Sequence, residues 1–73
     1  MAEQSLKRLN YFMVFVKLFA DSLGLDEKQA FNYLDAHKGA KFIEDHYEVI
    51  HTLDFTYAIN DVREICRANG GCL

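Results

Sequence analysis

The residues best suited to acid–base or metal chemistry are two histidines, His46 and His51, in a stretch whose apolar residues recur with a helical period. They stand five residues apart, and at about 100° per residue this spacing separates their side chains by about 140° on a helix. Zinc-binding helices place two histidines four residues apart on one face. We therefore expect no metal site here. Because His46 falls inside the apolar arc, we expect it in the core, bonded to a backbone carbonyl or to Asp61.

Other reactive side chains lack the neighbours that catalysis needs. Glu44 and Glu48 share a polar helical face, which usually means a solvated surface. A cysteine nucleophile requires a base held against it, whereas Cys66 is expected in the core and Cys72 in a loose tail. The sequence predicts no catalytic residue, no cofactor and no enzymatic activity.

Apolar periodicity and capping signals predict an all-α fold, a small compact bundle. Its four helices are expected at about 5–23, 26–38, 40–53 and 60–69. Gly24 is placed for a left-handed cap, Asp26 and Gln29 form a capping box, and Asn60 is a candidate N-cap. Residues 54–59 mix aromatic and β-branched side chains, and they could be extended, a turn or the front of the last helix.

The 73 residues are expected to form one domain, 1–73, with 1–4 and 70–73 frayed. Eight basic and eleven acidic residues give a formal charge of −3, so nucleic acid is not an expected partner. The longest apolar run, Tyr11 to Val16, is too short to cross a membrane, and no signal-peptide pattern is convincing. These features, with only two cysteines, favour a cytoplasmic protein.

The expected first helix is apolar on two sides. One stripe is Leu9, Phe12, Val16, Phe19 and Leu23, with Met13 beside it. Tyr11, Val14 and Leu18 project elsewhere, so the helix is either surrounded by its own domain or shared with another chain. The residues that we expect to bind a partner are Tyr11, Val14, Leu18, Phe55 and Tyr57. The alternative is that these side chains complete the core.

A polar set is expected to have a structural role. It consists of His46, Tyr47, His51, Thr52 and Asp61. We expect it to tie the end of the third helix to the start of the fourth, with Thr52 or Asp61 satisfying terminal backbone groups.

The run His-Tyr-Glu-Val-Ile-His-Thr-Leu at 46–53, followed by Thr-Tyr-Ala-Ile at 56–59 and Asp61-Val62, resembles the signature of a family of small uncharacterised bacterial proteins. That family carries a Tyr-Glu-x-Leu-His-Thr run and is often encoded beside an ADP-ribosyltransferase-like toxin. The resemblance implies an antitoxin-like or accessory protein that binds such a toxin. A self-associating helical homodimer is the alternative.

Overall fold

The computed structural model describes the backbone of residues 2–73 and the side chains of residues 6–73. This part of the chain forms five helices and no strand, which confirms the expected small all-α bundle. The helices are α1 Ala2–Leu23, α2 Glu27–Ala36, α3 Gly39–Asp45, α4 Tyr47–Ile50 and α5 Phe55–Ala68. Met1, which we expected to belong to a frayed end, lies outside the described residues.

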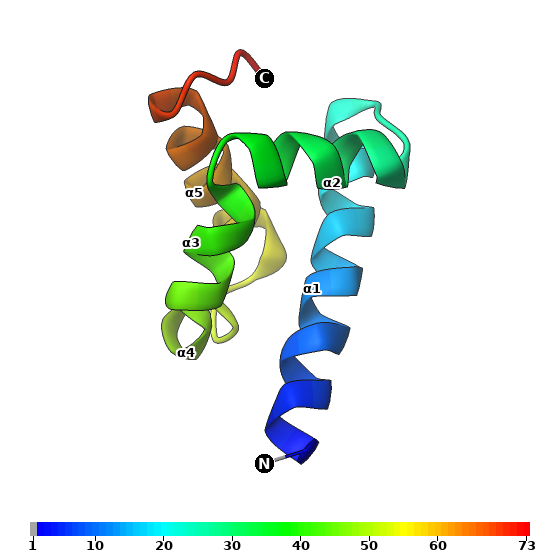
Figure 1. Ribbon diagram of the computed structural model, residues 1–73, viewed down its shortest axis with the longest axis vertical. Helices are drawn as coiled ribbons and strands as arrows, with labels where there is room; N and C mark the ends of the chain where they lie inside the picture. The colour runs from blue at the N-terminus through cyan, green and yellow to red at the C-terminus, as the bar shows by residue number, and fades with distance from the viewer. Residues whose placement is uncertain (1) are drawn as a thin grey trace.

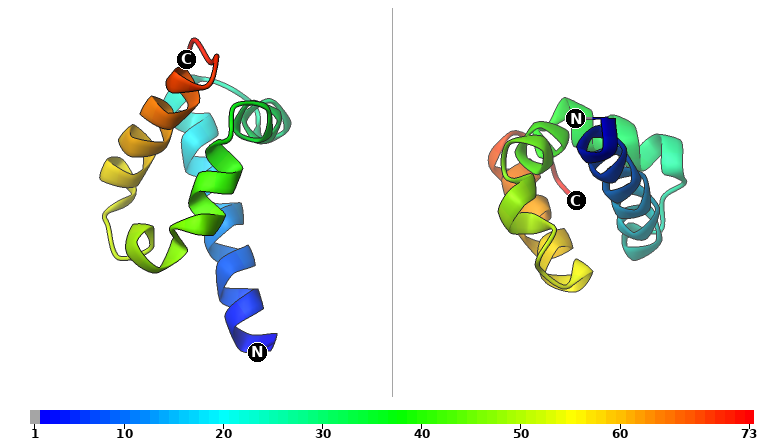
Figure 2. Two further views of the ribbon diagram at one scale, coloured as in Figure 1. Left: turned by 60° about the vertical axis from the view of Figure 1, so that its left-hand side comes forward. Right: turned by 90° about the horizontal axis from the view of Figure 1, so that it is seen from below.

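Helix α1 is the longest element and sets the length of the molecule. Its 22 residues span about 33 Å at 1.5 Å per residue, in a structure whose longest dimension is 36 Å. Helix α2 crosses the C-terminal part of α1. Helices α3 and α5 pack against each other beside α1 (Figure 1). The first turns of α1 extend past the other helices, as Figure 2 also shows.

The link between α1 and α2 follows the local signals in the sequence. Gly24 ends α1 with a positive φ of 70°, which glycine adopts without steric cost. The Asp26 side chain then accepts a hydrogen bond from the Gln29 backbone N–H, and the Gln29 side chain accepts one from the Asp26 N–H. The predicted capping box is therefore confirmed.

The single helix expected over 40–53 is divided at His46. His46 closes α3 with φ −116° and ψ 24°, and its carbonyl accepts from the N–H groups of Val49 and Ile50 to begin α4. The break leaves both Ile43 and Ile50 buried, so it is compatible with the apolar pattern that predicted one continuous helix. The expectation of a buried His46 is wrong, because the bend turns this side chain into solvent.

The last helix begins five residues earlier than we expected. Asp54, not Asn60, is its N-cap, and the Asp54 carboxylate accepts from the Thr56 N–H at 3.0 Å. Residues 55–59 are helical, and Asn60 is an exposed position inside α5. Early initiation brings Phe55, Ala58 and Ile59 onto the core side of the helix.

The core lies where α1, α2, α3 and α5 meet. Its largest fully buried side chains are Phe15, Phe19, Leu34, Val62 and Cys66. Phe15 and Phe19 stack with ring centroids 5.8 Å apart, one turn apart on α1. These rings form the central buried stripe of α1.

Candidate functional site

The apolar surface of α1 extends beyond its buried stripe. On one side of that stripe Leu6, Leu9 and Met13, here called the open flank, are 59%, 53% and 61% exposed. Their spacing of three and four residues places them along one face of the helix. A row of large apolar side chains on one helical face is normally covered, so its exposure here marks a surface that could contact another molecule.

A groove runs between the open flank and α2. Its volume is about 460 Å³, and aliphatic or aromatic side chains form most of its wall. Those side chains are Leu9, Phe12, Met13, Val16 and Phe31. Phe31 is 45% exposed and meets Phe12 edge-on at 5.9 Å, so its ring forms a side of the groove rather than filling it. Glu27 and Lys28 supply its charged rim.

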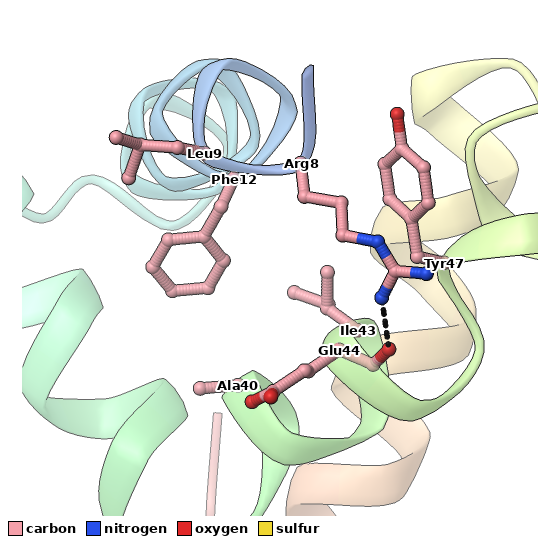
Figure 3. A pocket seen from close by; sticks show the side chains of 7 residues that line it. All are labelled: Arg8, Leu9, Phe12, Ala40, Ile43, Glu44 and Tyr47. Atoms are coloured by element: carbon pink, nitrogen blue, oxygen red, sulfur yellow. Dashed lines mark hydrogen bonds between the residues drawn. The ribbon is translucent and has the colours of Figure 1, made fainter. Parts of the chain in front are cut away.

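A second hollow, of about 370 Å³, continues from the groove toward α3 and α4. Leu9 and Phe12 line both, so the two hollows are neighbours along α1. Figure 3 shows Arg8 reaching across this second hollow toward Tyr47, with Ile43 and Ala40 on the α3 side.

Arg8 is held loosely at the mouth of this hollow. Its guanidinium carbon lies 4.9 Å from the centre of the Tyr47 ring. Its nitrogens lie 3.5 Å from the Glu44 carbonyl and 3.5 Å from the Glu48 carboxylate. These long contacts at exposed side chains are worth little to stability, so Arg8 is available to another molecule.

The five predicted partner-binding residues divide into two groups. Tyr11, Leu18 and Phe55 are half-buried and pack against the core. Val14 and Tyr57 are exposed, by 47% and 66% of their surface. Tyr11 and Phe55 come together, with rings stacked at 5.2 Å, although they are far apart in sequence.

Tyr11 is tied to α4 as well as to α5. Its hydroxyl donates a hydrogen bond to the Ile50 carbonyl at 3.3 Å, and its ring meets the Tyr47 ring edge-on at 5.6 Å. Partial burial raises the pKa of the Tyr11 hydroxyl above its usual value, and the nearby Tyr47 adds to the effect. Tyr11 therefore fastens the covered side of α1 to the α4–α5 corner.

Three members of the predicted polar set, Tyr47, His51 and Thr52, make local contacts within α4 and the turn after it. The His51 Nδ1 lies 2.7 Å from the Tyr47 carbonyl, and the two rings stack at 4.5 Å. The Thr52 hydroxyl donates to the Val49 carbonyl at 2.6 Å, so it satisfies a helix-end acceptor as expected. Asp61 is exposed on α5, and it is Asp54 that satisfies the start of that helix.

Sequence reasoning missed the open flank and the exposed ring of Phe31. Leu9 was assigned to an apolar stripe with Met13 beside it, and both side chains are more than half exposed. The available signal was the continuation of the Leu9–Met13 spacing back to Leu6. With Leu6 included, the apolar arc of α1 is wider than the face that one neighbouring helix covers.

Within residues 6–73, no three His, Cys, Asp or Glu side chains gather where they could hold a metal ion. Cys66 is fully buried, as we expected, and burial raises the pKa of its thiol. None of the described helices combines the length and the apolar character that a membrane crossing requires.

Comparison with known proteins gives one finding. No curated protein and no solved structure matches the chain. One family model, described as "Protein of unknown function (DUF3791)", matches residues 10–69, and this match covers α2 to α5 and most of α1. The chain therefore belongs to the DUF3791 family.

Proposed function

We propose that this protein is a non-catalytic protein-binding module that works by placing the open flank and its groove against a partner. The observation that carries the proposal is the exposure of Leu6, Leu9 and Met13, each more than half open to solvent. Large apolar side chains around a central groove are the usual anchors of protein interfaces. Val14 and Tyr57, exposed elsewhere, are candidates for a peripheral contact.

The proposed partner is an ADP-ribosyltransferase-like toxin, and the protein would act as its antitoxin-like or accessory subunit. Support comes from the resemblance of the 46–62 region to a family often encoded beside such toxins. The net charge of the chain, −3, adds to this support, because an acidic chain favours a basic protein partner.

Coexpression with the neighbouring transferase-like gene, followed by copurification and titration, tests the proposal. We expect a complex that survives at micromolar concentration. In the Leu9→Ser/Met13→Ser variant, the loss of two interface anchors is expected to weaken binding by about 100-fold or more. Its melting temperature should stay close to that of the parent, because both side chains are already exposed.

A matched variant, Val14→Ser/Tyr57→Ser, separates the open flank from the residues predicted from sequence. It removes the same number of exposed apolar side chains from the other side of α1 and from α5. We expect it to change the affinity by less than about tenfold. Two proteins that stay unbound at micromolar concentration would contradict the proposal.

The alternative occupant of the open flank is a second copy of the chain. The Leu6–Leu9–Met13 spacing could interdigitate with its own copy across a two-fold axis. Light scattering of the purified chain separates the two ideas, since a stable dimer without any partner favours self-association. A monomer leaves the flank free for a different protein.

A further inference from the structure

The groove between the open flank and α2 has helices for both of its walls. The α1 wall runs from Leu9 to Val16, in the middle of a helix whose backbone N–H and C=O groups bond one another. The α2 wall includes Glu27 and Lys28 from the first turn, so backbone N–H groups without a partner inside the helix are confined to one end of the groove. Along most of its length the groove therefore offers an occupant apolar side chains and no backbone partner.

The helical walls limit the backbone conformation of an occupant. An extended segment buried in the groove would turn some of its N–H and C=O groups toward apolar side chains, and each buried polar group without a partner costs free energy. An α-helix satisfies its backbone groups internally and presents only side chains to its surroundings. A helix is therefore the segment that can fill this groove without leaving polar groups unpaired.

The open flank also sets the spacing of the apolar side chains that such a helix needs. Leu6 and Met13 are seven residues apart, which is two turns or about 10 Å of helix. Phe31, 45% exposed, forms the opposite side of the groove. A helix packed along this surface contacts it with residues three, four and seven positions apart. Three apolar side chains over two turns would match the exposed row.

The charges around the two hollows are not equally balanced. At the groove Glu27 and Lys28 are neighbours of opposite sign, so their charges cancel. The hollow near α3 and α4 is lined by Arg8 and Glu44, and Arg8 also pairs with Glu48. Among these three side chains, one cation stands with two carboxylates. The second hollow therefore has an excess of negative charge, and a basic side chain of the partner is complementary to it.

Arg8 indicates where that basic side chain would lie. Figure 3 shows Arg8 reaching to the Tyr47 ring, with its guanidinium carbon 4.9 Å from the ring centre. Because the parallel His51 ring at 4.5 Å covers one face of Tyr47, the guanidinium lies over the other. Its contacts with the Glu44 carbonyl and the Glu48 carboxylate, both 3.5 Å, are long for hydrogen bonds. An arginine or lysine from another protein can therefore displace Arg8 and bind to the same ring and carboxylates.

From these features we propose that an amphipathic α-helix of the protein partner covers the open flank. Three of its apolar side chains, spaced by three or four residues, pack along the groove. A basic side chain at the end nearer α4 enters the second hollow and displaces Arg8 from the Tyr47 ring. This proposal rests on the protein-binding function proposed above, and it specifies the conformation and the charge of the segment that binds.

Photo-crosslinking tests the helical conformation. The chain has two methionines, so replacing methionine with photo-methionine labels only Met1 and Met13, and these two positions fall in different tryptic peptides. In the complex with the proposed partner, an ADP-ribosyltransferase-like protein, we expect Met13 to crosslink to partner residues that recur three or four positions apart in one segment. Crosslinks to residues two positions apart, or to a second copy of this chain, overturn the proposal.

Charge substitutions test the basic side chain. Glu44→Gln/Glu48→Gln should weaken the complex by about tenfold, because it removes both carboxylates from the second hollow. Arg8→Gln should bind the partner more tightly than the unaltered chain does, because the cation that competes for the Tyr47 ring is gone. The matched control Asp61→Asn/Glu64→Gln removes two exposed carboxylates from α5 and should change the affinity by less than about twofold. Weaker binding by Arg8→Gln, or equal effects of the two double variants, overturns the proposal.

The outcomes distinguish this proposal from the function on which it rests. Two proteins that stay unbound at micromolar concentration contradict the protein-binding function, and the helix with it. A complex that Leu9→Ser/Met13→Ser weakens would support the open flank as the interface. If that same complex gives crosslinks two positions apart, or loses affinity in Arg8→Gln, only the helix and its basic side chain are overturned.

Discussion

The two sides of α1 have similar apolar content and opposite surroundings. On the open flank, Leu6, Leu9 and Met13 are each more than half exposed, and Leu9 and Met13 line a groove that the described part of the chain leaves unfilled. On the covered flank, formed by Tyr11 and Leu18, the corner between α4 and α5 packs against the helix. The difference depends on which neighbours reach each side, because both flanks border the same buried Phe15–Phe19 stripe.

This comparison separates stability from binding. Side chains on the covered flank exclude water within the chain, so their removal should lower the free energy of unfolding. Side chains on the open flank are already hydrated, so their removal should matter only when a partner covers them. The following substitutions test that separation, beginning with the largest expected change in stability.

The sharpest contrast is Tyr11→Ala against Met13→Ala. Tyr11→Ala removes a half-buried ring and its hydrogen bond to the Ile50 carbonyl, so we expect a loss of about 2 kcal/mol in unfolding free energy. Met13→Ala should change it by less than about 0.5 kcal/mol. Urea denaturation of both variants measures their unfolding free energies. Equal losses would mean that the two flanks do not differ as described.

The N-cap of α5 supports the covered flank, because it fixes the turn that carries Phe55. Asp54→Ala removes the acceptor for the Thr56 N–H and should cost about 1 kcal/mol. Asn60→Ala, at an exposed position inside the helix, should be neutral or slightly stabilising, since alanine is the better helix former. Thermal denaturation of the two variants measures their stabilities. A larger loss of stability in Asn60→Ala than in Asp54→Ala would contradict the early start of α5.

His51 lies next to the covered flank without forming it. Its ring stacks on Tyr47 and its Nδ1 lies 2.7 Å from the Tyr47 carbonyl, in an exposed setting. His51→Ala should therefore lower stability by about 0.5 to 1 kcal/mol and leave partner affinity unchanged. Calorimetric melting and a binding titration measure the two quantities. An unchanged melting temperature with lost binding would place His51 in the interface.

The smallest expected effect concerns alkaline pH. Because the pKa of Tyr11 is raised above 10.0 in the folded chain, its contribution to stability is complete below the unfolded pKa and declines as pH rises through the folded pKa. In Tyr11→Phe this part of the alkaline loss should disappear, so stability should fall less steeply above about pH 10. Urea midpoints at a series of alkaline pH values give the slopes. Identical slopes would contradict burial of the Tyr11 hydroxyl.

Features that depend on near neighbours in sequence could be predicted. The Asp26–Gln29 capping box and the positive φ at Gly24 each involve a few consecutive residues, and both are present. The presence of four longer helices also followed from the apolar period. The break at His46 did not, because bending there keeps Ile43 and Ile50 on the core side.

Features that depend on distant contacts could not be predicted. Tyr11 and Phe55 were predicted to bind a partner, and in the structure both are half-buried with their rings stacked on each other. Leu9 and Met13 were assigned to or beside an apolar stripe of the first helix, and both are more than half exposed. Periodicity identifies the apolar faces of α1, but which face is covered depends on where α2, α4 and α5 pack.

The most direct test of the account follows the side-chain methyl signals of the chain by NMR as the proposed partner, an ADP-ribosyltransferase-like protein, is added. The account predicts that the methyl groups of Leu6, Leu9 and Met13 shift and lose contact with water, while those of Leu18 stay nearly unchanged. Changes confined to Val14 and Leu18, with Leu9 and Met13 still hydrated in the complex, would contradict it.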